Sequence, residues 1–358
     1  MNRLIAFIRR NQGPLLTLLF VAGFVGDLIA FTILDLSAVN LLFLGYLVVA
    51  AALTSLSHAL GRPADVRSDR VGMVAALAPL GASFAIGGLL SGCLIFYTKS
   101  AVLSVSWPFL LLLVLIFLGN EFLRTYRSHL AFQTVLFFFA LYAYLIFALP
   151  LYVNRLGPGV FLESTALASV IFALYLFFLR FVGRRSLKGL SRNIALGSVG
   201  VVATVMTLYF SGLVPPIPLT AKESGIYHRI VRTGDGYEVT HEGWSRWSRF
   251  LTREVHHVPG TPLYAYSAVF APAAFSANIA HRWERYDEAA KRWVTESMIA
   301  FTLSGGRAGG YRGYSEKSDP RPGRWRVTIE TLEGQVIGRL NFTVESVSAP
   351  PVLYTDMR

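Results

Sequence analysis

The sequence predicts a polytopic α-helical membrane bundle followed by an all-β, immunoglobulin-like sandwich. Of its 358 residues, 54% are hydrophobic and only 15% are charged, whereas soluble domains carry about 25% charged residues. Long apolar runs fill the first 214 residues, and alternating polar and apolar residues follow the prolines at 215 and 216. We therefore expect a membrane domain over residues 1–214 and an extracytoplasmic β domain over 215–358, and an ordinary cytosolic enzyme is not expected.

Seven apolar stretches are long enough to cross a bilayer, which takes about 20 residues in a helix. They lie near residues 14–34, 37–60, 72–96, 102–123, 131–153, 160–182 and 193–213. The first stretch could be a cleaved signal peptide, but it is too long for one and Asp27 interrupts it. We interpret it as a retained first span.

The connections between these stretches orient the bundle, because Lys and Arg are retained on the cytoplasmic side. One alternating set carries 13 basic residues and the opposite set only Lys99 and Arg155. The 13 are Arg3, Arg9, Arg10, Arg62, Arg67, Arg70, Arg124, Arg127, Arg180, Arg184, Arg185, Lys188 and Arg192. This asymmetry predicts a multi-pass protein of the bacterial inner membrane with a cytoplasmic N-terminus and a periplasmic C-terminal domain. It also explains most of the net charge of +12, so the lipid bilayer is the expected partner and nucleic acid is not.

Two ionisable positions within the apolar stretches are candidate sites, because such groups are costly in a bilayer. Asp27 suggests a cation or proton site, or else a carboxyl that is protonated or hydrogen-bonded to a neighbouring helix. Glu121 and Arg124 are three residues apart and can meet on one helix face. With the inner arginines they could bind an anionic head group, or they could form a local pair beside arginines that only set the topology.

Glycines are frequent in the third apolar stretch. Gly88 and Gly92 have the small-xxx-small spacing that lets membrane helices approach closely. The alternative is a helix broken at Pro79, as in some transporters. We expect close packing.

Nine strands are expected in the C-terminal half, near residues 226–233, 236–241, 249–256, 263–271, 277–286, 291–303, 311–317, 324–331 and 335–345. The clearest pair alternates apolar and polar residues on both sides of a Glu333-Gly334 turn, which predicts a hairpin with one buried face. Cys93 is the only cysteine, so the β domain must be held by its own core. The Cys…Trp…Cys hallmark of antibody domains is missing, and only the sandwich architecture is predicted.

Several motifs in this half resemble those of a known family. In order they are His281-x-Trp283, Tyr311-Arg312-Gly313-Tyr314-Ser315, Pro322-Gly323-Arg324-Trp325-Arg326-Val327, Gly334, and Gly338 followed by Phe342-Thr343-Val344. Over about residues 260–345 the chain resembles the bacterial domain-of-unknown-function family 2914, and the membrane half is more loosely similar to the uncharacterised multi-helix segment that precedes such domains. The resemblance implies an envelope protein and supplies no catalytic residues. The chain departs from the family pattern in the long connection that contains Gly305-Gly306-Arg307.

The motif residues have two possible roles. Trp283 is expected to point inward beside His281, whereas Arg312 and Arg326 need partners. They could stack on aromatic rings, or with Trp283 and Tyr314 they could line a groove for an anionic or sugar ligand. The adjacent histidines at 256 and 257 point opposite ways on a strand, so no metal site and no cofactor are expected.

No catalytic triad signature, zinc motif or nucleotide fingerprint is present. We therefore expect a non-catalytic protein whose periplasmic sandwich binds an envelope component, either a glycan or a protein partner. The alternative is a transporter or a lipid-processing protein that acts through the bundle around Asp27 and Glu121. A purely structural envelope scaffold is a third possibility.

Overall fold

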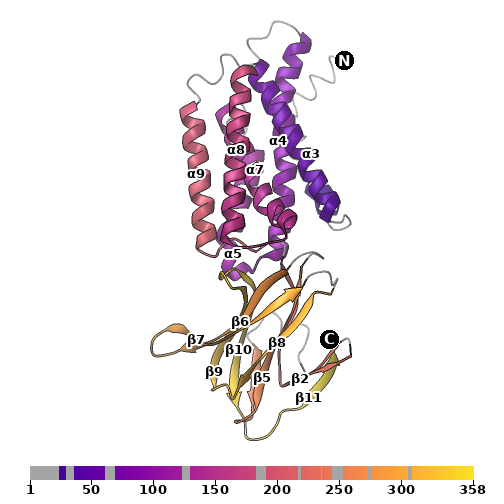
Figure 1. Cartoon of the computed structure of the whole chain (residues 1–358), viewed down its shortest axis with the longest axis vertical. Coiled ribbons are helices and arrows are strands. Elements are labelled where there is room, and N and C mark those ends of the chain that lie inside the picture. The colour runs from indigo at the N-terminus through magenta and orange to yellow at the C-terminus, as the bar shows by residue number, and fades with distance from the viewer. Residues whose placement is uncertain are drawn as a thin grey trace. The chain divides into compact units, whose positions relative to one another are not determined.

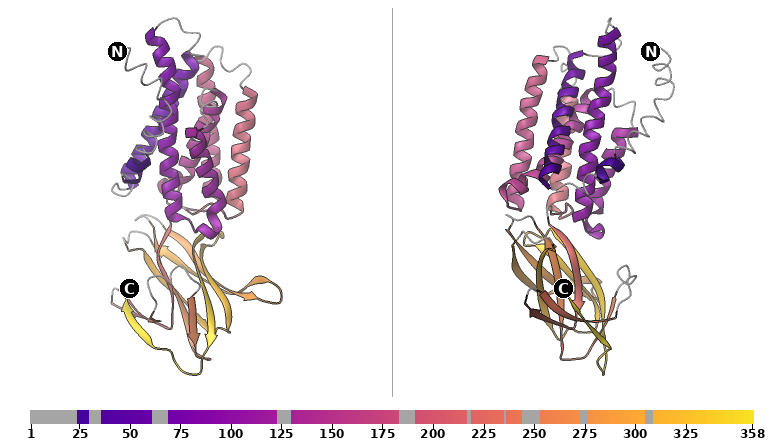
Figure 2. Two further views of the ribbon diagram at one scale, coloured as in Figure 1. Left: turned by 180° about the vertical axis from the view of Figure 1, so that it is seen from behind. Right: turned by 90° about the vertical axis from the view of Figure 1, so that its right-hand side faces the viewer.

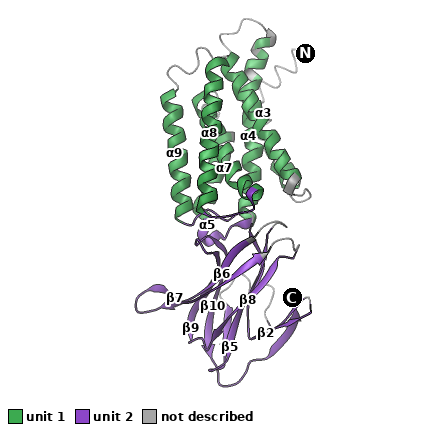
Figure 3. Cartoon of the chain, in the orientation of Figure 1, with its two compact units in different colours: residues 1–99, 107–152, 158–211 green, residues 100–106, 153–157, 212–358 purple. Residues whose placement is uncertain are grey.

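The computed structural model describes residues 24–29, 36–60, 69–122, 130–182, 191–216, 219–234, 236–243, 253–271, 276–304 and 309–358. The chain divides into two compact units (Figure 3). The helical unit comprises Met1–Lys99, Trp107–Tyr152 and Pro158–Ser211, and the β unit comprises Ser100–Ser106, Val153–Gly157 and Gly212–Arg358.

Six helices among the described residues are long and apolar enough to cross a membrane. They are α3 (Leu36–Leu60), α4 (Asp69–Ser100), α5 (Leu103–Phe122), α7 (Leu130–Val153), α8 (Pro158–Val182) and α9 (Ser191–Phe210), and they run side by side in the views of Figures 1 and 2. They correspond to the second to seventh predicted stretches. Of the first stretch the structure describes residues 24–29, which are helical, and the rest lies outside the described residues.

Helix α7 forms the centre of the helical unit. In its apolar span 83% of the residues are buried, against 17% in α9. Aromatic side chains make these contacts: Phe138 lies 4.5 Å from Phe172 of α8, and Phe147 lies 5.6 Å from Phe43 of α3, between ring centroids. The outer helices therefore keep many apolar side chains on their surfaces.

Helix α4 is continuous through Pro79, so the alternative of a broken helix does not apply. Its glycines leave space that side chains of α3 occupy. A Cβ on Gly88 would lie 2.6 Å from the ring of Tyr46, and a Cβ on Gly81 would lie 2.6 Å from Leu53 Cδ1. The expected close packing is present, although the contacts at these two glycines are with large side chains rather than with backbone.

The β unit contains three sheets. The five-stranded sheet has the order β4-β10-β9-β6-β7, and the three-stranded sheets have the orders β1-β5-β8 and β11-β3-β2. The strands are β1 (Thr220–Tyr227), β2 (Arg229–Thr233), β3 (Gly236–Glu242), β4 (Arg253–His257), β5 (Pro262–Phe270), β6 (Ser276–Asp287), β7 (Arg292–Ser304), β8 (Tyr311–Ser318), β9 (Gly323–Thr331), β10 (Val336–Ser346) and β11 (Leu353–Met357).

The predicted hairpin is present. Strands β9 and β10 pair antiparallel, with Trp325 opposite Phe342. Gly334 in the connecting turn has φ +84°, a conformation that costs glycine little and other residues more. The turn explains why a glycine follows Glu333 at this point.

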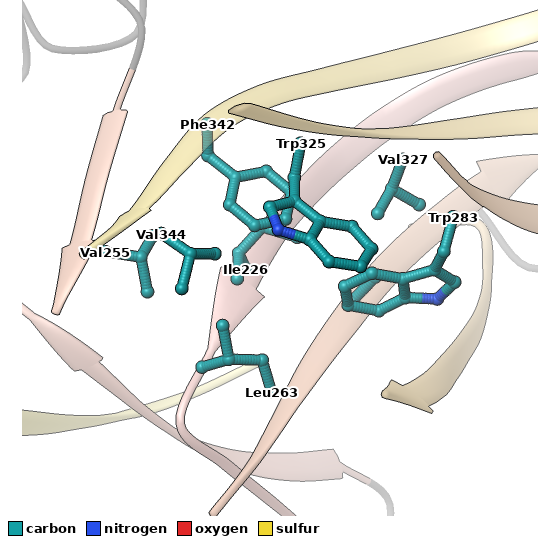
Figure 4. Close-up of a cluster of buried hydrophobic side chains, with 9 residues drawn as sticks. Ile226, Val255, Leu263, Trp283, Trp325, Val327, Phe342 and Val344 are labelled. Carbon is teal, nitrogen blue, oxygen red and sulfur yellow. The ribbon is translucent and has the colours of Figure 1, made fainter. Parts of the chain in front are cut away.

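The main core lies between the five-stranded sheet and the β1-β5-β8 sheet (Figure 4). Trp283 and Trp325 are fully buried, with ring centroids 6.3 Å apart in an edge-to-face arrangement. Each indole N–H is satisfied, since Trp283 donates to Ser315 Oγ (2.9 Å) and Trp325 donates to the Arg321 carbonyl (2.8 Å). Two large amphipathic rings can therefore be buried without an unpaired donor.

A second cluster packs the third sheet on the other side of the β1-β5-β8 sheet. Its members are Tyr227, Ile230, Val239, Tyr266 and Ala268, with Tyr237 and Tyr264 at its margin. The predicted two-sheet sandwich does not include this layer. Its edge strand β11 is exposed at every position and so has no alternation of buried and exposed residues from which to recognise it.

Candidate functional site

The four residues of the expected groove do not line one surface. Trp283 has no exposed surface and belongs to the core. Arg312 and Tyr314 lie on the outward side of β8, opposite Ala268 and Tyr266 of β5, so they face away from the core. Arg326 lies on the outward side of the five-stranded sheet, opposite Glu284. The core separates Arg326 from the other two.

Arg312 and Tyr314 have partners in the layer that contains the third sheet. Arg312 Nη1 donates to the Arg358 carbonyl at 3.2 Å. Tyr314 is 41% exposed, and its ring lies 5.9 Å from Tyr237 and 6.1 Å from Tyr264 between centroids. This end of β8 is an aromatic surface with one exposed ring.

Asp27 lies in the helical unit and is only 7% exposed. The Tyr46 hydroxyl donates to its Oδ1 at 3.0 Å, and the Ser91 hydroxyl donates to Oδ2. Within the described part of the chain, the carboxyl group is thus held by two hydroxyl groups. The predicted head-group pocket cannot be placed, because Arg124 and the side chain of Glu121 lie outside the described residues.

The outward side of β6, β9 and β10 carries a cluster of charged side chains, which we call the arginine face. It consists of five residues around the buried Thr328: Arg282, Glu284, Arg326, Glu330 and Arg339. Side chains alternate along a strand, so Trp325, Val327 and Ile329 point to the core while the residues between them point outward. The same alternation that builds the core therefore builds this face.

Two ion pairs cross from β6 to β9 on the arginine face. Arg326 binds Glu284 through two hydrogen bonds, Nε to Oε2 at 2.6 Å and Nη2 to Oε1 at 2.8 Å. Arg282 Nη2 donates to Glu330 Oε2 at 2.6 Å. The Arg326 guanidinium also lies 4.5 Å from the ring centroid of Trp293 on β7. Paired hydrogen bonds and stacking hold this arginine in one orientation.

The electrostatic balance of this face is positive. Burial raises the pKa of Glu330, and the charge of Arg282 offsets this effect only in part. Burial also acts to raise the pKa of Glu284, but the hydrogen bond and charge of Arg326 outweigh it, so that the pKa of Glu284 is lowered. Burial, together with the charges of Arg326 and Arg282, lowers the pKa of Arg339. Three guanidinium groups thus share two carboxylates.

Residues 276–344 match the family described as protein of unknown function (DUF2914). The match confirms the resemblance seen in the motifs. It covers β6 to β10 and therefore the whole arginine face, but neither the helical unit nor the third sheet.

Other comparisons add little to the DUF2914 match. No curated protein matches the chain. A β-glucosidase from Listeria innocua, solved with gluconolactone, is 12% identical over 37% of this chain and 17% of its own length, with a TM-score of 0.19. An alkylpurine DNA glycosylase from Pseudomonas fluorescens is 8% identical over 78% of this chain and 82% of its own, with a TM-score of 0.22. Similarities this low carry no argument about function.

The first motif of the DUF2914 region has a structural role. His281 is fully buried, and hydrogen bonds join its Nε2 to Ser267 Oγ (2.8 Å) and its Nδ1 to Ser315 Oγ (2.9 Å). Burial lowers the pKa of His281 to about 4, so the imidazole is neutral at neutral pH. The three side chains connect β6 to the facing β5 and β8, and this histidine is a fixed part of the core.

A polar cluster that the sequence did not predict lies outside the DUF2914 region, and we call it the Glu242 cluster. The Glu242 carboxylate accepts hydrogen bonds from His228 Nε2 (2.9 Å), His256 Nδ1 (2.7 Å) and the His256 backbone N–H (2.8 Å). These residues come from the β1–β2 connection, the end of β3 and β4, so only the folded chain brings them together. Among the described residues, no group of three or more His, Cys, Asp or Glu side chains is arranged to hold a metal ion.

Proposed function

We propose that the helical unit anchors the protein in the bacterial inner membrane with its N-terminus in the cytoplasm. On this proposal the β unit lies in the periplasm and binds an envelope component, a glycan or a protein partner, without catalysis. Six helices of suitable length and hydropathy and the asymmetry of 13 basic residues against 2 support the anchoring and the orientation. The first stretch, as a seventh span, completes the odd number that this orientation requires.

The observation that carries the binding role is the arginine face. Two of its arginine side chains are partly accessible, since those of Arg282 and Arg326 are 32% and 20% exposed. Met298 on β7 lies opposite Arg282 and is 48% exposed. Arginine, methionine and aromatic side chains are the residue types enriched where proteins bind partners, and here they occur together on the outward side of one sheet.

Site-specific photocrosslinking tests this assignment in living cells. The photoreactive residue p-benzoylphenylalanine replaces Met298 in the full-length protein, and it replaces Tyr314, on the other side of the β unit, as the matched control. We expect an adduct with an envelope glycan or protein at 298 and none at 314. An adduct only at 314, or at neither position, would contradict binding at the arginine face.

The second candidate function is transport or lipid processing by the helical unit. Asp27 favours it, because a buried carboxyl group held only by hydroxyls among the described residues is expensive to keep without a functional reason. If this candidate holds, Asp27→Asn and Glu121→Gln each abolish complementation of a deletion strain while the protein remains folded in the membrane. Full complementation by both variants would exclude it.

A further inference from the structure

We infer that the arginine face binds a singly charged oxyanion with two terminal oxygens, a phosphodiester or a carboxylate, between Arg282 and Arg339. This inference rests on the proposed function, because it specifies what the envelope component presents to the face. Three features of the described residues lead to it: the position of the two arginines, their unpaired nitrogen atoms, and the net charge.

The register of the strands brings the two arginines together. Arg282 on β6 lies opposite Thr328 on β9, and Thr328 lies opposite Arg339 on β10. Neighbouring strands are about 4.8 Å apart, so the two backbone positions are separated by about 10 Å. Thr328 between them is short and fully buried. Two long side chains therefore flank a short residue that is covered by its neighbours in the middle of the face.

The hydrogen bonds of the arginines are incomplete. Arg326 uses Nε and Nη2 on Glu284, and Arg282 uses Nη2 on Glu330. Among the described residues, the Nε atoms of Arg282 and Arg339 are buried and have no hydrogen-bond partner. Buried donors are normally satisfied. A bound anion would supply an acceptor for each of these nitrogen atoms once the arginine side chain turns to expose it.

The charge of the cluster determines the class of ligand. Three arginines and two glutamates leave one positive charge, which a monoanion neutralises and a dianion exceeds. A guanidinium group presents its donors as a planar fork that matches two oxygens of one acceptor group. Carboxylates and phosphodiesters both offer that pair of oxygens with a single negative charge.

Titration of the full-length protein in dodecyl maltoside tests the inference with small probes. Dimethyl phosphate and acetate represent the two sources of the oxyanion, and the neutral trimethyl phosphate is the matched control. We expect saturable binding of at least one anion, measured by calorimetry, and none of trimethyl phosphate. Tighter binding of dimethyl phosphate would indicate a phosphodiester polymer or lipid as the source, and tighter binding of acetate a carboxylate-bearing glycan or peptide.

Variants with opposite expected effects separate recognition from misfolding. Arg339→Gln is expected to weaken binding at least tenfold, and Glu330→Gln to tighten it severalfold, because it frees Arg282 without changing the shape of the side chain. Arg324→Gln is the control, since Arg324 is already paired with Glu288 and stacked on Tyr286, and it should bind within about twofold of the wild type.

The two proposals fail in different ways. If no anion saturates the protein, if trimethyl phosphate binds equally well, or if Arg339→Gln leaves the affinity unchanged, the inference is wrong. An adduct at position 298 would then still support the proposed function. Anion binding with the expected variant pattern, but without an adduct at 298, would contradict the proposed function instead.

Discussion

Ser315 shows how much of the β unit depends on one hydroxyl group. It accepts a hydrogen bond from Trp283 and is joined by another to His281, and all three residues are buried. Ser315→Ala leaves the indole N–H and one imidazole nitrogen without their partner, which costs about 2–6 kcal/mol for two unsatisfied groups. We expect a lower thermal midpoint of the tryptophan signal. Ser318→Ala on the same strand is exposed and should match the wild type, and equal midpoints for both variants would contradict this role.

The Glu242 cluster predicts a dependence of stability on pH. Hydrogen bonding to Glu242 raises the pKa of His256 above 6.5, so its contribution is fully present below pH 6.5 and is lost as the pH rises through the folded pKa. Burial acts to raise the pKa of Glu242 itself, but the hydrogen bonds from His228 and His256 outweigh burial and lower this pKa below 4.5. That contribution is present above pH 4.5 and is lost as the pH falls through the folded pKa.

The cluster therefore stabilises the β unit most between about pH 4.5 and 6.5. Thermal midpoints measured from below pH 4.5 to above pH 6.5 should be highest within this range in the wild type. Glu242→Gln should flatten the profile, because a neutral amide cannot pair with a charged imidazole. A variant profile parallel to that of the wild type would show that the cluster does not contribute.

For single residues, the sequence predicts which side of a strand a side chain faces better than it predicts which residue that side chain binds. Alternation along β9 placed Trp325 inside and Arg326 outside, and both positions are confirmed. The partner of Arg326 is Glu284, 42 residues earlier, and no local pattern encodes that pairing. The same holds for Glu242, whose histidines become its neighbours only when β3 and β4 come together.

At the element scale, the strands that the sequence predicts best are those with one buried face. β9 and β10 have clear alternation, and their bounds and hairpin follow from it. The single strand expected at 226–233 is in the structure the end of β1 and the whole of β2. The break between them falls at His228, and the sequence gives no sign of it because this residue is neither glycine nor proline. Strand β11 escaped prediction because its burial does not alternate, and with it the third sheet.

The packing of α3 against α4 depends on the absence of a side chain at Gly88. A Cβ on Gly88 would lie 2.6 Å from the Tyr46 ring, whereas a Cβ on Gly45 would meet nothing within 4 Å. Gly88→Ala should therefore lower the stability of the helical unit by about 1–3 kcal/mol through overpacking, seen as a lower midpoint of aggregation in detergent. Gly45→Ala should not lower it. A Gly88→Ala variant as stable as Gly45→Ala would show that Tyr46 moves freely.

For the whole molecule, composition and charge predict a helical part followed by a β part, and the two compact units have those contents. What the sequence could not supply is the location of the proposed binding surface. The arginine face forms from three strands spread over residues 276–346, and its positive balance becomes visible only after each glutamate is assigned to its arginine. Net charge along the chain does not contain that information.

The proposed function requires that the helical unit hold the β unit outside the cytoplasm. Cys93 is buried, so single cysteines introduced at Glu288, on the exposed β6–β7 turn, and at Ser186, in the basic connection after α8, can be labelled selectively in cells. With a membrane-impermeant maleimide, Glu288→Cys should be labelled in spheroplasts and Ser186→Cys only after lysis. Labelling of Ser186→Cys in spheroplasts, with Glu288→Cys protected until lysis, would show the opposite orientation and contradict the proposed function.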